Sequence, residues 1–552
     1  MTHVITRGCC NDAACVSVCP VNCIHPTPDE PEYKNAEILY IDPRTCIDCG
    51  ACVEVCPVDA IKRDVDVSPA ERDYLALNAR FFDGFTYPQP GFIESVRTPM
   101  SAARPDRLRL AVVGSGPAGV YAVEAALAAT NGDADIHVFE RLPVPWGLVR
   151  YGVAPDHQDT KRITRGLERI LSAPQVSVHL NVEIGRHLSH DDLLRHHHAV
   201  IYAVGAPEDR RLDIAGEALP GSHSAADFVA WYNGHPDAAY RQFDLSHPRA
   251  VIFGNGNVAL DAARILVSRI EELARSDIAE YALDALRHSG VEEVLVVGRR
   301  GHRQAAYTTP ELLALSNTPG VDLLLDPTGL DGLSSETDSA KAEFVATLPH
   351  TGGQRTGNKR VILTFLSSPV RVLGTEQVTG VRLMRNHLSR NSAGAQVVDA
   401  SGETYDVECG LVLRAIGYRG HSLDGLRCDD EMGTFLHDRG RVLDDDGSPL
   451  PGVYAAGWAK RGPSGVIGTN RSCAGETVAA LIDDFSRGDL PEPPCSAAQL
   501  RQLLHERQPA MLDLASWRRV DLFERAQGRA VERPRIKLVD TEQMVDIGRS
   551  GR

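Results

Sequence analysis

Short apolar runs followed by glycine-rich turns and helical stretches occur twice along this chain. The first apolar run spans residues 108–113, turns at 114–119 and continues as a helical stretch, and the next apolar run ends at Glu140. The second begins at 249, turns at 254–259 and is followed by an apolar run that ends at Arg299-Arg300. Because buried strands alternate with helices in this order, the pattern predicts an α/β fold built on two dinucleotide-binding, Rossmann-like units.

The first glycine turn predicts a site for FAD. It reads Gly114-Ser115-Gly116-Pro117-Ala118-Gly119, and such a turn lets the backbone approach a pyrophosphate at the N-terminus of the following helix. Glu140 lies about twenty residues further on, where this fold places the carboxylate that binds the ribose hydroxyls. Because a carboxylate there would repel a 2′-phosphate, we expect FAD, with NAD as the alternative.

The second turn predicts a site for NADP(H). In Gly254-Asn255-Gly256-Asn257-Val258-Ala259, alanine replaces the third glycine, which the fold tolerates. Guanidinium groups at Arg299 and Arg300 suit a 2′-phosphate, and a solvated pair on a loop is the alternative. The spacing from the turn to these arginines is long, and we attribute it to a helical insertion around residues 270–288.

Cysteines are concentrated in the N-terminal region: of thirteen in the chain, nine lie within residues 1–56. Four read Cys46-x2-Cys49-x2-Cys52-x3-Cys56-Pro57, a spacing that binds iron–sulfur clusters in bacterial ferredoxins. The frame recurs upstream as Cys9-x2-Asp12-x2-Cys15-x3-Cys19-Pro20, which indicates an internal duplication. A structural zinc site is the alternative, but zinc sites need neither the Cys-Pro ends nor a fourth ligand exchanged between the runs.

Residues 3–85 therefore resemble the two-cluster bacterial ferredoxins, which have an α+β fold. The resemblance implies that one [4Fe–4S] cluster is held by Cys19, Cys46, Cys49 and Cys52. A second cluster would be held by Cys9, Cys15 and Cys56, with Asp12 at its fourth corner. Because oxygen binds iron less firmly than thiolate, this cluster is either [4Fe–4S] with Asp12 as ligand or [3Fe–4S]. We expect free thiols beside the clusters at Cys10 and Cys23, and ordinary small apolar residues at Cys409, Cys428, Cys473 and Cys495.

Further landmarks predict how the domains are connected. Short apolar runs end at Gly205, Gly417 and Gly457, as expected when one nucleotide-binding domain is inserted into another. A helical run from Ser68 to Phe81 precedes a stretch rich in proline and glycine that is typical of a linker. The predicted order is a two-cluster ferredoxin domain at 1–67, a cap helix and linker at 68–105, an FAD domain at 106–209 and 408–495, an NADP domain inserted at 210–407, and a C-terminal helical extension at 496–552.

Four longer runs, at residues 141–157, 254–261, 298–301 and 457–470, closely resemble the adrenodoxin reductase-like ferredoxin–NADP reductases. The chain as a whole is similar to the mycobacterial-type fusion of a ferredoxin to such a reductase. Besides Gly114, Gly116 and Gly119, the resemblance implies FAD contacts at Ala118, Glu140, Leu148, Val182, Trp458, Gly465, Val466 and Ile467. For NADP it implies contacts at Asn255, Gly256, Asn257, Val258, Arg299, Arg300, Glu311 and Gly465.

The resemblance also implies that His157 and Glu311 lie near the nicotinamide and flavin rings, as candidate catalytic residues. Hydride transfer needs no enzymic acid or base in principle, because the two rings supply the chemistry. His157 would therefore steady the flavin or relay its proton, and a plain structural role is the alternative. A further run, His196-His197-His198, lacks the partner spacing of a metal site, and we expect it to be solvated.

A formal net charge of −16 over 552 residues argues against nucleic acid or an anionic membrane surface as a partner. The N-terminal residues lead directly into the cysteine motif without an apolar core of signal-peptide length, and no later apolar stretch is long enough to span a bilayer, so we expect a cytoplasmic protein. The predicted function is that of a ferredoxin–NADP(+) reductase, which passes electrons from NADPH through FAD and the clusters to a ferredoxin or another one-electron acceptor. One alternative is a flavoprotein subunit of the glutamate synthase small-subunit type, which residues 141–157 disfavour. Another is a redox sensor, which leaves two intact nucleotide sites unexplained.

Overall fold

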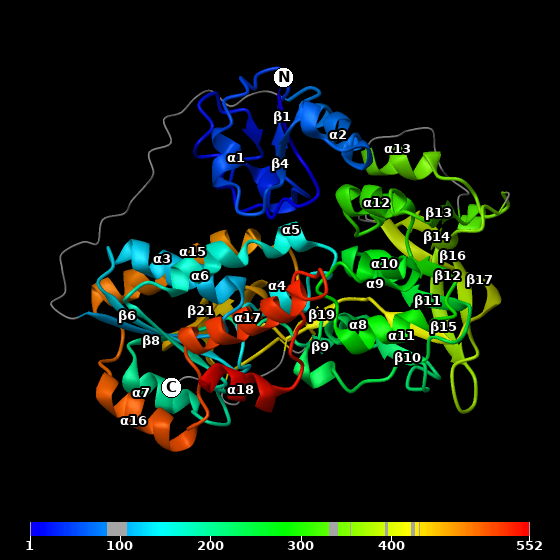
Figure 1. The fold of residues 1–552 in the computed structure, drawn as a ribbon. Coiled ribbons are helices and arrows are strands. Elements are labelled where there is room, and N and C mark those ends of the chain that lie inside the picture. Colours follow the sequence, from blue (N-terminus) through cyan, green and yellow to red (C-terminus); the bar gives the residue numbers. More distant parts are fainter. Residues whose placement is uncertain are drawn as a thin grey trace.

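The computed structural model describes residues 2–85, 107–329, 340–353, 355–391, 396–420, 426–429 and 431–550. Figure 1 shows a small N-terminal unit that lies across two larger units standing side by side. The proline- and glycine-rich part of the predicted linker, residues 86–105, lies outside the described residues.

The N-terminal unit is built around two small pairs of antiparallel strands, which one helix joins. β1 (His3–Ile5) pairs with β4 (Ile61–Arg63), and β2 (Ile24–His25) pairs with β3 (Tyr40–Ile41). The helical run predicted from Ser68 forms a 3-10 turn, η3 (Pro69–Glu71), followed by α2 (Asp73–Phe81). The side chain of buried Asn78 in α2 accepts hydrogen bonds from the backbone of Ile5 at 3.1 Å and Ile41 at 3.0 Å, so α2 joins β1 to β3. The other elements of this unit are η1 (Pro31–Asn35), α1 (Ala51–Val55) and η2 (Asp64–Asp66).

The first large unit is a seven-stranded sheet in the order β20-β21-β22-β8-β5-β6-β7. Adjacent strands run parallel from β22 through β8, β5 and β6 to β7, as expected where helices connect the strands. Its strands are β5 (Leu108–Val113), β6 (Ala134–Glu140), β7 (Val176–Leu180), β8 (Ala199–Tyr202), β20 (His437–Asp438), β21 (Arg441–Leu443) and β22 (Pro449–Ala455). α3 (Pro117–Ala129), α6 (Thr164–Leu171) and α15 (Thr469–Arg487) cover the side of the sheet that faces the N-terminal unit (Figure 1).

The second large unit contains a six-stranded parallel sheet in the order β10-β18-β11-β12-β14-β13. Its strands are β10 (Ser222–Ser224), β11 (Arg249–Phe253), β12 (Glu293–Val297), β13 (Val321–Leu325), β14 (Lys359–Thr364) and β18 (Leu411–Arg414). The predicted boundary at 407/408 is wrong, because β18 pairs with β10 and β11 of this sheet. The chain therefore returns to the first sheet only after β18.

Two short strands and a three-stranded sheet complete the second large unit. β9 (Glu208–Asp209) and β19 (Tyr418–Arg419) pair antiparallel where the chain passes between the large units. β15 (Ser367–Leu373), β16 (Gly380–Arg390) and β17 (Gln396–Glu408) form an antiparallel sheet. The helical insertion expected around residues 270–288 contains α10 (Ile270–Leu273) and α11 (Glu280–Arg287), which accounts for the long spacing before Arg299. The other helical elements here are α8 (Ala225–Tyr232), η4 (Pro236–Ala238), α9 (Asn257–Val267), η5 (His302–Gln304), α12 (Thr309–Ser316), η6 (Pro327–Gly329) and α13 (Ala340–Thr347).

The C-terminal helices pack against the first large unit. Glu524 of α17 (Leu514–Arg529) is fully buried and forms an ion pair with Arg150 of α4 (Leu148–Tyr151), with an N–O distance of 2.5 Å. Because both charges are buried and paired, this contact ties the last segment of the chain to the segment after β6. The remaining helices of the unit are α5 (Gln158–Lys161), α7 (His190–His196), α14 (Trp458–Arg461), α16 (Ala497–Arg507) and α18 (Thr541–Arg549).

Candidate functional site

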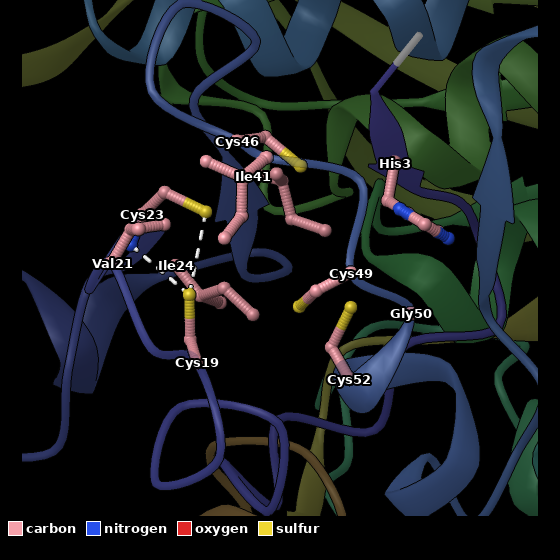
Figure 2. Close-up of a pocket in the computed structure, with 11 residues that line it drawn as sticks. His3, Cys19, Val21, Cys23, Ile24, Ile41, Cys46, Cys49, Gly50 and Cys52 are labelled. Atoms are coloured by element: carbon pink, nitrogen blue, oxygen red, sulfur yellow. Dashed lines mark hydrogen bonds between the residues drawn. The ribbon is translucent and has the colours of Figure 1, made fainter.

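One cavity in the N-terminal unit gathers four of the predicted cluster ligands. Its lining includes the thiols of Cys19, Cys46, Cys49 and Cys52. Figure 2 shows the sulfur atoms of Cys19, Cys49 and Cys52 directed toward the same space. α1 begins directly after Gly50 and places Cys52 in its first turn, which brings the closely spaced thiols of this run together. A donor set of four thiols around one cavity fits a [4Fe–4S] cluster.

Cys23 lies beside this first set without belonging to the predicted ligands. Its sulfur is 3.4 Å from that of Cys19, and its backbone N–H donates to the Cys19 sulfur at 3.3 Å (Figure 2). Such N–H···S contacts stabilise a thiolate. The Cys23 thiol and the backbone bonds hold the pKa of the Cys19 thiol below its usual value, at about 5.

In the second predicted set, Cys9 and Cys56 pack against the apolar core of the first large unit, and Cys15 and Asp12 lie near them. Burial raises the pKa of the Cys9 thiol to about 12, and the nearby charges of Cys56 and Asp12 add to the rise. Burial likewise raises the pKa of the Asp12 carboxyl. Closely placed buried acids of this kind need a compensating positive charge to ionise, which bound iron would supply. These residues therefore also fit a cluster.

The loop of the second set contacts the turn that precedes α15. The backbone N–H of Gly468 donates to the Cys10 carbonyl at 2.7 Å, and the Arg471 guanidinium donates to the Asp12 carbonyl at 3.3 Å. Cys10, Val58 and Ala60 share an apolar core with residues of the first sheet. This loop therefore adjoins Gly465, Val466 and Ile467, the segment expected to contact FAD.

The first glycine turn forms a cradle at the N-terminus of α3. Gly114 has a φ of 105°, and a Cβ there would lie 2.4 Å from the carbonyl oxygen of Ala203, so only glycine fits. No side chain of the described residues caps α3, whose N-cap is Gly116. Uncapped N–H groups at the start of a helix bind phosphate, so the cradle fits the pyrophosphate of FAD.

The other residues predicted for FAD lie on the segments that surround this turn. The Glu140 carboxylate accepts hydrogen bonds from the Ser115 N–H at 3.1 Å and hydroxyl at 2.7 Å, which places it beside the turn. The N–H of buried Val182 donates to the Glu140 carbonyl at 2.8 Å. Leu148 is 44% exposed at the start of α4, and the Trp458 ring lies 5.5 Å from that of Tyr418.

The second turn repeats this geometry at α9. Gly254 has a φ of 108°, and a Cβ there would lie 2.1 Å from the carbonyl oxygen of Ala415. Gly256 is the N-cap of α9, which no side chain of the described part of the chain caps. Asn255 accepts the N–H of Tyr307 at 2.8 Å, and the Asn257 side chain accepts the N–H of Thr308 at 2.8 Å, so the turn is joined to the start of α12. Val258 lies half-buried in the first turn of α9.

Arg299 and Arg300 follow β12 with exposed side chains and a fixed backbone. The Asn386 side chain donates to the Arg299 carbonyl at 3.0 Å, and the Leu366 N–H donates to that of Arg300 at 3.1 Å. The backbone that carries both side chains is therefore fixed, while both guanidinium groups are exposed and can bind a phosphate.

His157 and Glu311, the predicted catalytic pair, come together between the two large units. The Arg7 guanidinium of the N-terminal unit donates to the Glu311 carboxylate at 2.6 Å and also bonds His157 Nε2. Arg264 of α9 donates to the same Nε2 at 2.9 Å and forms ion pairs of 2.7 Å with Asp156 and Asp261. All three units of the chain therefore contribute to one charged cluster.

The arginines set the charge states in this cluster. Burial lowers the pKa of His157, and the Arg7 charge lowers it further. Burial alone would raise the pKa of Glu311, but the charge and hydrogen bond of Arg7, together with the Arg264 charge, hold that pKa well below its usual value. Because guanidinium donors from Arg7 and Arg264 both face Nε2, this nitrogen accepts, which corresponds to a neutral imidazole ring beside an ionised carboxylate.

Donor atoms of His157, Asp261 and Glu311 lie within 4.8 Å of one another, a spacing that a metal ion could bridge. The guanidinium groups of Arg7 and Arg264 already lie among these atoms. Two fixed cations repel a metal ion, so this trio is an ion-pair cluster.

The run His196-His197-His198 is not solvated as predicted, because all three side chains are buried. The Nδ1 atoms of His196 and His197 bond the carbonyls of Asp192 and Leu193, at 2.6 and 2.8 Å, and His198 Nδ1 accepts the Arg109 N–H at 2.9 Å. One ring nitrogen of each imidazole therefore has a main-chain partner, which offsets part of the cost of burying it. The run therefore joins the end of α7 to β5 and β8.

Comparisons with known proteins cover both parts of the chain. Residues 7–60 match the family described as 4Fe-4S dicluster domain. The chain is 45% identical over 558 residues to the probable ferredoxin/ferredoxin–NADP reductase of Mycobacterium leprae, which covers 99% of this chain and 98% of that protein. It is 36% identical over 465 residues to the mitochondrial NADPH:adrenodoxin oxidoreductase of Arabidopsis thaliana, which covers 81% of this chain and 96% of that protein.

Among solved structures, Mycobacterium tuberculosis FprA in complex with NADPH superposes with a TM-score of 0.76 at 42% identity, over 80% of this chain and 100% of that chain. Within the described residues, no helix is both long and apolar enough to cross a lipid bilayer.

Proposed function

This chain belongs to the ferredoxin/ferredoxin–NADP reductases and catalyses electron transfer between NADPH and ferredoxin, and we propose that the three units divide this task among four cofactor sites. The first large unit would hold FAD, the second NADP(H), and the N-terminal unit two iron–sulfur clusters. When bound, nicotinamide and flavin supply hydride chemistry and the clusters supply one-electron chemistry. The polypeptide supplies position and electrostatics.

The flavin assignment rests on the cradle of Gly114, Gly116 and Gly119 at an uncapped helix N-terminus, with Glu140 at the adjacent strand end. A carboxylate at this place suits ribose hydroxyls and disfavours a 2′-phosphate. Ala118, Leu148, Val182, Trp458, Gly465, Val466 and Ile467 are the proposed remaining FAD contacts.

The NADP assignment rests on Asn255, Gly256, Asn257 and Val258 at the start of α9 together with exposed Arg299 and Arg300. The arginines would bind the 2′-phosphate, while His157 and Glu311 would face the nicotinamide. A neutral His157 can orient a ring without repelling its charge, so we propose an orienting role for it.

The cluster assignment gives the two cysteine sets different properties. Cys19, Cys46, Cys49 and Cys52 offer four thiolates, and we propose a [4Fe–4S] cluster there. Cys9, Cys15 and Cys56 offer three with Asp12 as a weak fourth, and we propose a cluster that interconverts readily between [4Fe–4S] and [3Fe–4S]. The acceptor is proposed to be a ferredoxin or another protein that takes one electron at a time.

The contact of Gly468 with Cys10 is the observation that carries this proposal, because it joins the loop of the Asp12 set to the segment proposed to contact FAD. The test measures NADPH-dependent reduction of ferricyanide and of cytochrome c by the same preparation, before and after removal of iron with a chelator. We expect loss of iron to abolish most cytochrome c reduction and to spare ferricyanide reduction. Equal loss of both activities would contradict the division between units.

A further inference from the structure

Arg7 is the residue through which the N-terminal unit enters the cluster of His157 and Glu311. Its Nη2 lies 2.6 Å from Glu311 Oε2 and 4.0 Å from Asp261 Oδ1 of the second large unit. The same nitrogen bonds His157 Nε2 of the first large unit. One side chain therefore bridges both nucleotide-binding units.

The position of Arg7 is fixed by its own unit. The preceding residue, Thr6, donates its N–H to the Ala60 carbonyl at 2.9 Å and its hydroxyl to the same carbonyl at 3.1 Å. The Cys9 N–H donates to the Thr6 carbonyl at 3.2 Å. Because β1 and the cysteine loop hold the backbone on both sides, the guanidinium reaches the cluster only when the N-terminal unit is docked.

Arg7 supplies one of the two arginine charges that face the carboxylates of this cluster. Arg7 and Arg264 face the carboxylates of Asp156, Asp261 and Glu311. Without Arg7, a single arginine would face three carboxylates. Glu311 is only 13% exposed and Asp261 15%, so solvent screens these charges weakly.

We propose that Arg7 is a charge-setting and positioning residue of the nicotinamide site, through which the docked ferredoxin unit weakens binding of the oxidised nicotinamide relative to the reduced one. The inference rests on the proposed placement of the nicotinamide beside His157 and Glu311. The oxidised ring carries a positive charge, which the carboxylates attract and Arg7 repels. The reduced ring is neutral and responds little to the same charge. Arg7 therefore favours release of NADP+ after NADPH has been oxidised.

The test compares binding of ligands that differ in ring charge, using full-length protein with its cofactors. Dissociation constants are measured by calorimetry for NADP+, for a redox-inactive tetrahydro analogue of NADPH with a neutral ring, and for 2′,5′-ADP, which has no ring. Arg7→Met should lower the dissociation constant for NADP+ roughly tenfold, because one nearby positive charge is lost. The dissociation constants for the other two ligands should change little. Arg7→Lys keeps the charge and should resemble the original chain.

The matched control is Arg80→Met. Arg80 forms an ion pair with Glu343 of α13, so this variant also removes an arginine contact between the N-terminal and second large units, away from His157. Arg80→Met should leave the ratio of the dissociation constants for NADP+ and the tetrahydro analogue unchanged. An unchanged ratio in Arg7→Met, or the same shift in Arg80→Met, would overturn the inference. Failure of the original chain to bind 2′,5′-ADP would instead overturn the NADP assignment itself.

Discussion

The backbone N–H of Gly468 donates a hydrogen bond of 2.7 Å to the carbonyl oxygen of Cys10, which joins the start of α15 to the loop that carries Cys9 and Asp12. The approach is so close that a Cβ at residue 468 would lie 1.9 Å from the Asn11 carbonyl oxygen. Only glycine permits this contact between the two units, since every other side chain would push the loop away.

Gly468→Ala should therefore impair transfer from the reductase to external acceptors. We expect the rate of NADPH-dependent cytochrome c reduction to fall roughly tenfold or more, because a displacement of about 1 Å at a reacting interface is costly. Ferricyanide reduction should change little. Gly475→Ala in the same helix is the control, because a Cβ there meets no atom within 4 Å. Equal cytochrome c rates in both variants would show that this contact does not govern transfer.

Deletion of residues 1–105 should leave a yellow protein that retains FAD and NADPH:ferricyanide activity and lacks the broad iron–sulfur absorbance. FprA, which matches 80% of this chain over its own full length, supports the expectation that the remainder folds. The deletion uncovers apolar residues that now pack on Cys10, Val58 and Ala60, so the melting temperature should fall. Absorbance spectra and calorimetry measure these properties, and loss of FAD would refute the boundary.

Periodicity alone predicted both nucleotide-binding units, because buried runs and glycine turns impose strands and helix starts locally. It placed the return of the chain to the FAD domain too early, at residue 408. The apolar run of β18 fits either sheet, and only its pairing with β11 shows that it belongs to the second large unit. It could not find Arg7, whose partners His157 and Glu311 lie 150 and 304 residues away. It also misjudged His196–His198, because His196 and His197 bond carbonyls of their own helix and only the tertiary structure brings the Arg109 N–H to His198.

Asp12→Cys should stabilise the second cluster. In the original chain, electron paramagnetic resonance after exposure to air should show a [3Fe–4S] signal, because an oxygen ligand holds the fourth iron weakly. The cysteine variant should keep its iron and lack this signal. Asp12→Ala is the comparison and should lose iron at least as readily as the original chain. If air leaves both clusters of the original chain intact, Asp12 does not weaken the binding of the fourth iron.

Ile47→Glu should slow reduction of protein acceptors. Ile47 is 58% exposed and lines the cavity of Cys46 and Cys49, so it presents an apolar surface beside the outer thiols. We expect a higher KM for cytochrome c or ferredoxin and no change with ferricyanide, which is small. Val65→Glu is the control, because Val65 is 62% exposed in the same unit and does not line this cavity. A similar KM increase in both variants would assign the effect to net charge alone.

Replacing Arg299 and Arg300 together with alanine should remove the preference for NADPH over NADH. Each charged hydrogen bond to a 2′-phosphate contributes roughly 1.5–3 kcal/mol, so the two arginines supply discrimination of about a hundredfold or more. The KM for NADPH should rise accordingly, while that for NADH stays nearly constant. Flavin content should not change, because Glu140 and its glycine turn belong to the other unit.

Arg382→Ala is the matched control for this charge loss, since Arg382 is a partly exposed arginine on β16 of the same unit, where it pairs with Asp406. Steady-state kinetics with both nucleotides distinguish the outcomes. An equal loss with NADPH and NADH in the double variant would mean that the arginines support the fold or the shared pyrophosphate, and the assignment of the 2′-phosphate to this strand end would then be wrong.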